Sequence, residues 1–225
     1  MNLQLLTSKL IHTFRTEGVP ATCRRVMAHL GRKRSEEDFD RRHRTDTGGL
    51  EPLWKFSIRS PNARFGERYQ ATGEEELLAA LEFLGEDFRD FTFIDLGCGK
   101  GRTLMVAANQ GFRRVIGVEF AKELAEIATR NLARHQASNV IVSHSDAADF
   151  TFPNGDMVLY LYNPFSEEVL RKVVSNFRAS AWNKLYLIYK TPRCADLLDA
   201  SGFLKRFGQP PSAPQMEIWR GWADS

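Results

Sequence analysis

The chain has 225 residues, of which 43% are hydrophobic, enough for one well-packed α/β domain with an extension but not for two full domains. No stretch approaches the roughly 18 uninterrupted apolar residues that a membrane-spanning helix needs. The start of the chain lacks an apolar block with a small-residue cleavage site. The three cysteines lack metal-ligand spacing and form no even disulfide set. We therefore expect a cytoplasmic protein in a reducing compartment, with no membrane contact and no metal site.

The net charge of +3 is mild but unevenly distributed. The first 50 residues carry ten Lys/Arg against six Asp/Glu. A basic arm of this kind can meet an acidic partner or nucleic acid. Since the acids are interleaved among the arginines, a solvated face is the favoured interpretation, and nucleic acid is the less favoured partner.

Residues 1–31 predict one or two amphipathic helices, because apolar side chains recur at helical spacing. Residues 31–73 have an irregular pattern with paired glycines and many charges, which predicts a long surface connection. Together, residues 1–73 form a predicted N-terminal helical and irregular extension and a candidate active-site lid. The polar, glycine-containing stretch 38–49 could cover the active site, although its sequence assigns it no specific role.

Residues 74–225 form the predicted main domain. It opens with a helix whose start is marked by Thr72 as cap and three glutamates in the first turn. Near-continuous apolar strands then alternate with helices, which predicts a doubly wound, mostly parallel sheet covered on both faces. A C-terminal antiparallel hairpin brings the expected strands to seven. The expected strands are 92–96, 114–118, 139–144, 156–162, 184–189, 202–207 and 215–222; the expected helices between them are 102–110, 121–135, 166–178 and 194–200.

A glycine-rich turn follows the first of these strands and opens directly into a helix. Gly97, Gly99 and Gly101 let the backbone turn sharply and let a ligand approach closely. The helix start offers free N–H groups to an anion. A dinucleotide fingerprint would be G-x-G-x-x-G, whereas here the spacing is G-x-G-x-G, which points away from NAD. Glu119, at the end of the second strand, occupies the position from which a carboxylate can accept both hydroxyls of a ribose.

The run Phe93-Ile-Asp-Leu-Gly-Cys-Gly-Lys-Gly, with an acid closing the second strand, resembles motif I of the class I, Rossmann-like S-adenosylmethionine-dependent methyltransferases. The resemblance spans residues 70–222. It implies that S-adenosyl-L-methionine is the cofactor, that the loop holds its amino-acid end and that Glu119 binds its ribose. It further implies adenine contacts from Phe120, Asp146 and the backbone of Ala147. The implied loop residues are Asp95, Gly97, Cys98, Gly99 and Gly101.

Four positions keep a structural alternative: Asp146, Thr72, Lys100 and Arg102. Asp146 is also a good turn cap, and Thr72 is a good helix cap. Tyr69 and Thr72 are candidate lid contacts, because a similar Tyr-containing segment closes over the methionine end of the cofactor in the non-SET lysine methyltransferases. Lys100 and Arg102 are interpreted as surface charges rather than contacts to an acidic group.

A second candidate site is Asn163-Pro164-Phe165, at the carboxyl end of the fourth strand. It resembles a relaxed Asn-Pro-Pro-Tyr/Phe motif of enzymes that methylate planar amino groups, and also the acceptor loop of the non-SET lysine methyltransferases. Both resemblances imply transfer to nitrogen, with Asn163 contacting cofactor and acceptor and Phe165 walling the site. The alternative is an ordinary strand-to-helix turn with Phe165 in the core.

The leading hypothesis is therefore an S-adenosylmethionine-dependent enzyme that N-methylates a protein side chain, lysine-like, or a small amine. The alternatives are a nucleic-acid or small-molecule O-methyltransferase, and a non-catalytic S-adenosylmethionine-binding interaction module. The expected partner is a protein or small-molecule methyl acceptor.

Overall fold

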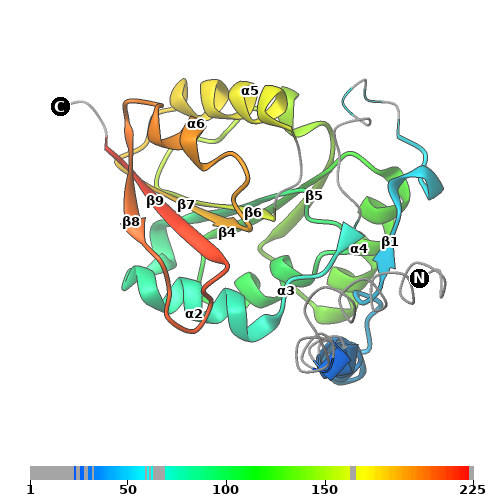
Figure 1. Ribbon diagram of the computed structural model, residues 1–225. Helices are drawn as coiled ribbons and strands as arrows, with labels where there is room; N and C mark the ends of the chain where they lie inside the picture. The colour runs from blue at the N-terminus through cyan, green and yellow to red at the C-terminus, as the bar shows by residue number, and fades with distance from the viewer. Residues whose placement is uncertain are drawn as a thin grey trace.

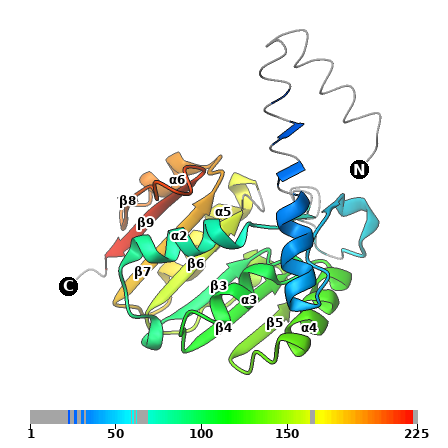
Figure 2. The same cartoon turned by 90° about the horizontal axis from the view of Figure 1, so that it is seen from below.

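The computed structural model describes residues 23, 26–27, 30–31, 33–58, 60, 62, 69–162 and 166–222. Its centre is a seven-stranded sheet (Figure 1) in the order β5-β4-β3-β6-β7-β9-β8, which can be followed in Figure 2. All neighbours from β5 to β7 pair in parallel, and β9 pairs antiparallel with both β7 and β8. The strands are β3 (Thr92–Leu96), β4 (Arg114–Glu119), β5 (Val140–His144), β6 (Met157–Tyr162), β7 (Lys184–Lys190), β8 (Leu204–Gly208) and β9 (Met216–Trp222). The predicted fold class, including the closing hairpin, is confirmed.

Helices cover both faces of the sheet because its central strands are apolar on both sides. Phe93 and Val158 face one layer, whereas their neighbours Ile94 and Leu159 face the other. The first layer contains α2 (Glu74–Leu84), α3 (Arg102–Ala108) and α4 (Lys122–His135). The second contains the short η4 (Ala147–Asp149), α5 (Glu167–Arg178) and α6 (Ala195–Asp199).

The strand order places a topological switch point between β3 and β6. From β3 the chain moves to β4 and β5 on one side, and it returns to β6 on the other. In open α/β sheets of this kind, ligands bind at the carboxyl ends of the strands beside the switch point. The loop that follows β3 and the residues that follow β6 therefore lie at the expected site.

The N-terminal region departs from the sequence prediction. Residues 33–43 are helical, and so are the described residues between 23 and 31 (Figure 2). The prediction that an irregular segment begins at Gly31 is therefore wrong. The helix was hidden because Phe39 is its one fully buried apolar side chain among residues 33–43, so the sequence shows no apolar stripe. The helices expected before residue 23 lie outside the described residues.

After this helix, β1 (Leu50–Glu51) pairs with β2 (Tyr69–Gln70), with the short η1 (Leu53–Lys55) between them. A further one-turn helix, η3 (Phe88–Asp90), leads into β3. Among the described residues, no helix combines the length and the apolar content needed to span a membrane.

Candidate functional site

The loop between β3 and α3 depends on its glycines. Gly97, Gly99 and Gly101 have φ angles of +89°, +55° and +86°, in the left-handed region that favours glycine. The N–H groups of Gly97 and Cys98 both donate to the carbonyl of Val118, at 2.8 and 3.1 Å, which ties the loop to β4. A Cβ atom on Gly99 would lie 2.2 Å from the ring of Tyr69. The loop therefore requires glycine for its backbone conformation and for its close contact with β2.

Glu119 lies beneath this loop, at the carboxyl end of β4. Its side chain is buried and accepts hydrogen bonds from the N–H groups of Gly99 at 2.8 Å and Ala121 at 2.9 Å. Burial raises the pKa of Glu119 to about 7, although these backbone donors counteract the shift. A carboxylate so placed can accept further hydrogen bonds from hydroxyl groups brought over the loop.

Asp95 is a second buried carboxylate, one strand away on β3. It accepts a hydrogen bond from the hydroxyl of Thr103 on α3. Burial raises the pKa of Asp95 to about 7, and the nearby charge of Glu119 adds to the rise. Two buried carboxylates with raised pKa values at adjacent strand ends are costly for stability, and such pairs are concentrated at functional sites.

Both carboxylate oxygens of Asp146 already accept hydrogen bonds from other residues of the chain. It is the N-cap of η4, where it accepts from the N–H of Ala148 at 2.8 Å, so the cap interpretation applies. Its other carboxylate oxygen accepts from the Ser60 hydroxyl and from the Asn62 amide, the latter at 2.9 Å. The adjoining Ala147 is buried. The one carboxylate thus serves both the local turn and a segment more than 80 residues away in the sequence.

A small apolar cluster lies beside the glycine loop. Tyr69, Ala71, Ala121 and Leu124 form its buried part, and the half-buried Phe56, Ile58 and Phe120 pack against it. Phe120, which directly follows Glu119 in the chain, therefore packs against the same cluster as Phe56 and Ile58.

Tyr69 and Thr72 make different contacts. The buried Tyr69 lies against Gly99 and donates its hydroxyl proton to the carbonyl oxygen of Thr47. Thr72 does not cap α2: its hydroxyl lies 2.6 Å from that of Tyr160, whereas the N-cap is Gly73. The Gly73 N–H donates to the carboxylate of Glu76, at 3.1 Å, which satisfies the helix start instead.

The interpretation of Lys100 and Arg102 as surface charges is wrong. Their exposed fractions are only 6% and 3%. Lys100 Nζ donates to a carboxylate oxygen of Asp46 at 3.1 Å, and Arg102 Nε donates to the hydroxyl of Thr47 at 2.7 Å. Both partners belong to the polar stretch 38–49. The sequence feature that could have indicated these contacts is the presence of Asp and Thr beside glycines in this stretch. No local pattern connects it with the glycine loop.

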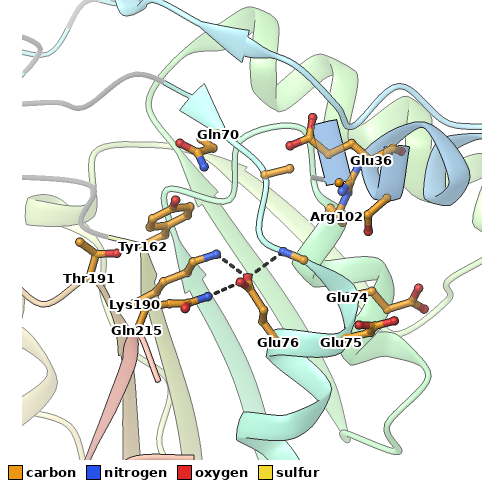
Figure 3. Close-up of a pocket in the computed structure, with 14 residues that line it drawn as sticks. Glu36, Gln70, Glu74, Glu75, Glu76, Arg102, Tyr162, Lys190, Thr191 and Gln215 are labelled. Carbon is orange, nitrogen blue, oxygen red and sulfur yellow. Dashed lines mark hydrogen bonds and ion pairs between the residues drawn. The ribbon is translucent and has the colours of Figure 1, made fainter. Parts of the chain in front are cut away.

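A cavity of about 600 Å³ opens at the carboxyl ends of β6 and β7 and the start of α2 (Figure 3). Glu76 is one of the residues that line it, and its carboxylate accepts hydrogen bonds from Lys190 Nζ at 2.5 Å and from the amide of Gln215. The Lys190 ammonium also lies 4.3 Å from the ring centre of Tyr162. The charged lining comprises four carboxylates and two cations: Glu36, Glu74, Glu75, Glu76, Arg102 and Lys190.

Most of the residues that line this cavity were not predicted from the sequence. Glu76 was noted only as part of an acidic first turn, and Lys190 was not singled out, although a charged residue closing an apolar strand was an available signal. The predicted acceptor residues Asn163, Pro164 and Phe165 lie outside the described residues. Tyr162, which directly precedes them, lines the cavity.

Comparisons with known proteins agree with this geometry. Residues 93–181 match a family model described as a methyltransferase domain. The methyltransferase candidate yhhF from Escherichia coli is 16% identical, with a TM-score of 0.57 over 78% of this chain and 100% of that one. An S-adenosylmethionine-dependent methyltransferase from Aquifex aeolicus is 15% identical, with a TM-score of 0.52 over 64% of this chain and 88% of that one. A search of curated proteins finds no match.

A third structure was solved with a product of methyl transfer. Phosphoethanolamine N-methyltransferase 1 from Haemonchus contortus, in complex with phosphoethanolamine and S-adenosylhomocysteine, is 13% identical, with a TM-score of 0.51 over 67% of this chain. The chain spans only 43% of that protein's length. At this identity the likeness concerns the fold. The matched model covers residues 93–181, so this part of the chain is a methyltransferase domain, and the strand order gives it the fold of the solved methyltransferases named above.

Proposed function

We propose that the residues around the glycine loop hold S-adenosylmethionine by its three parts. Glu119 accepts hydrogen bonds from the ribose hydroxyls, and the loop from Asp95 to Gly101, including Cys98, lies along the amino-acid end. Phe120 packs against the adenine ring. Support comes from the positive φ angles of the loop and from the buried Glu119 carboxylate beneath it, which has oxygen lone pairs left for hydroxyl donors.

The adenine amino group would be accepted by Asp146, beside the backbone of Ala147. The Asn62 amide now donates to the same carboxylate oxygen at 2.9 Å. An amide N–H and an adenine amino N–H are equivalent donors, so one can replace the other without leaving the carboxylate unpaired. Tyr69, whose ring lies on Gly99, would close over the methionine end, and Thr72 would hold the neighbouring backbone through Tyr160.

For the acceptor, we infer a protonated amine, a lysine side chain or a small amine. The observation that carries this inference is the cavity beside β6 and β7, where carboxylates outnumber cations and Tyr162 supplies an aromatic ring. Carboxylates and aromatic rings attract ammonium groups, whereas the same lining would repel the phosphates of a nucleic acid. We propose that Asn163, Pro164 and Phe165, which follow the cavity residue Tyr162, flank the reacting nitrogen.

The bound cofactor supplies an electrophilic methyl group on a sulfonium leaving group. Transfer to the acceptor nitrogen would form an N–C bond and break the C–S bond, whose electron pair would stay on sulfur. An amine with an ordinary pKa of about 10.4 must first release its proton. The cavity carboxylates bind the ammonium form and provide acceptors for that proton, so the chain's contribution is to concentrate, orient and deprotonate the amine.

Transfer of a labelled methyl group tests the acceptor class. We expect label in a short peptide with one lysine in a neutral background, and none in the same peptide with that lysine acetylated. Label in RNA or in a catechol, with none in any amine, would contradict the proposal. Neutralising one cavity carboxylate with Glu75→Gln should raise the KM for the lysine peptide about threefold at low salt, because Glu75 is an exposed charge.

The control for Glu75→Gln is Glu82→Gln. Glu82 is another exposed glutamate of α2, and it is not among the residues that line the cavity. It should leave the KM for the peptide unchanged, and neither variant should alter the affinity for S-adenosylhomocysteine. Equal effects of both variants would mean that the cavity carboxylates do not recognise the acceptor.

Cofactor affinity should depend on pH through Glu119. Ribose hydroxyls donate to the ionised carboxylate, so binding lowers the raised pKa of Glu119, which is about 7 in the free protein. Affinity is then complete above that pKa and falls as the pH drops through it, by up to about tenfold per unit. Calorimetric titration with S-adenosylhomocysteine from about pH 8 to about pH 6 measures this change. An affinity that rises or stays constant toward acid would contradict the role of Glu119.

A further inference from the structure

A turn outside the sheet is built around one carboxylate. Asp40, near the end of the N-terminal helix, accepts four hydrogen bonds from the residues that follow it. The donors are the Thr45 hydroxyl at 3.1 Å, the Thr47 N–H at 2.9 Å, the Thr47 hydroxyl at 2.6 Å and the Gly48 N–H at 2.8 Å. Thr47 is completely buried. We call residues 40–48 the Asp40 turn.

The Asp40 turn supplies partners to the two buried cations at the glycine loop and the start of α3, Lys100 and Arg102. Lys100 Nζ donates to Asp46 and, at 3.0 Å, to the carbonyl of Gly48. Arg102 donates through Nε to the Thr47 hydroxyl and lies 3.7 Å from the Asp40 carboxylate. Buried charges need such partners. The turn therefore determines how the loop and the first residue of α3 are held.

Two further contacts connect the turn to the same loop. Asn131 of α4, 1% exposed, bonds to both backbone groups of Asp46 and donates to the carbonyl of Lys100 at 3.0 Å. Tyr69, whose ring lies on Gly99, is held by its hydroxyl on the carbonyl of Thr47. The loop is thus fixed from three sides by hydrogen bonds that end in the Asp40 turn.

We propose that the Asp40 turn is a positioning element of the cofactor site, with the Thr47 hydroxyl as its central bridge between Asp40 and Arg102. It sets the conformation of the glycine loop and the place of Tyr69 without contacting the reacting atoms. The affinity for the cofactor then depends on residues that precede the methyltransferase fold.

Thr47→Val tests the proposal, because valine keeps the shape of threonine and removes only the bridging hydroxyl. We expect the Kd for S-adenosylhomocysteine to rise about tenfold, the usual effect of losing a hydrogen bond to a charged group. Thr47→Ser should restore it, since serine keeps the hydroxyl. The KM for S-adenosylmethionine should rise with the Kd while kcat at saturation stays close to that of the wild type.

Controls separate positioning from folding. Asp46→Ala removes an exposed side chain that pairs with Lys100, so it should fold normally and still raise the Kd several-fold. Asp38→Asn lies on the same helix in an exposed pair with Arg41, and it should change nothing. Thermal unfolding without ligand is measured for every variant. A lower melting temperature with an unchanged Kd would make the turn merely structural and overturn the proposal. Because product binding needs no acceptor, this outcome is independent of the amine assignment.

Discussion

Glu119→Ala should weaken the binding of S-adenosylmethionine at least about 100-fold, the expected cost of losing two charge-assisted hydrogen bonds. The substitution removes the proposed acceptor of the ribose hydroxyls and leaves the N–H groups of Gly99 and Ala121 without their buried partner. Because the Gly99 N–H belongs to the loop itself, the loop conformation should change as well. Calorimetric titration of both S-adenosylmethionine and S-adenosylhomocysteine measures the loss.

Glu126→Ala is the matched control. Glu126 lies on α4, seven residues further along the chain, and forms an exposed pair with Lys122. Its replacement should leave the affinity within about twofold of the wild type, as is usual for exposed ion pairs. If Glu119→Ala binds both ligands as the wild type does, the cofactor does not use this carboxylate.

Asp95→Asn should stabilise the ligand-free protein at about pH 8 by about 1–3 kcal/mol while weakening cofactor binding. Burial raises the pKa of Asp95 from 3.8 to about 7. At alkaline pH the folded protein therefore carries a buried charge that destabilises it. Asparagine keeps an oxygen for the Thr103 hydroxyl and carries no charge. The variant should therefore be more stable than the wild type but bind the cofactor more weakly.

The pH dependence of this gain has a definite sign. As the pH falls from the pKa of Asp95 in the folded protein toward its pKa in the unfolded chain, Asp95 takes up a proton in the folded wild type. The destabilisation caused by its buried charge then diminishes. The gain of Asp95→Asn should therefore be largest above about pH 7 and mostly lost by about pH 5. Urea unfolding of both proteins at the two pH values measures it. A gain that is equal at both values, or a loss at about pH 8, would contradict the burial argument.

The sheet could be predicted from the sequence because its information is local. Strands β3, β6 and β7 are near-continuous apolar runs, and the glycine loop follows the first of them directly, so the sequence predicts the fold and a candidate position for the cofactor site. The helix over residues 33–43 was not predictable by the same means. Phe39 is the one fully buried apolar residue of this helix between residues 33 and 43. The helix is therefore stabilised by tertiary contacts, such as that of Arg102 with the Phe39 ring.

The buried charges were also beyond local reasoning. Lys100 pairs with a residue 54 positions away, and Lys190 pairs with Glu76 across 114 positions. A lysine looks the same in a sequence whether it is solvated or buried on a carboxylate. Thr72 is a second example. Threonine is a preferred helix cap, but the Thr72 hydroxyl instead forms a hydrogen bond with Tyr160, a partner 88 residues distant.

The hydrogen bonds that Asp146 already accepts also bear on which bases the proposed cofactor site would select. Adenine would arrive at an acceptor that already holds the Ser60 hydroxyl and the Asn62 amide, so association is an exchange of donors rather than the filling of a gap. An exchange returns little net energy from that hydrogen bond, but it penalises any base that lacks the amino donor, because the amide would be displaced without replacement. In the proposed binding mode, Asp146 would therefore act as a filter that favours a base with an amino donor.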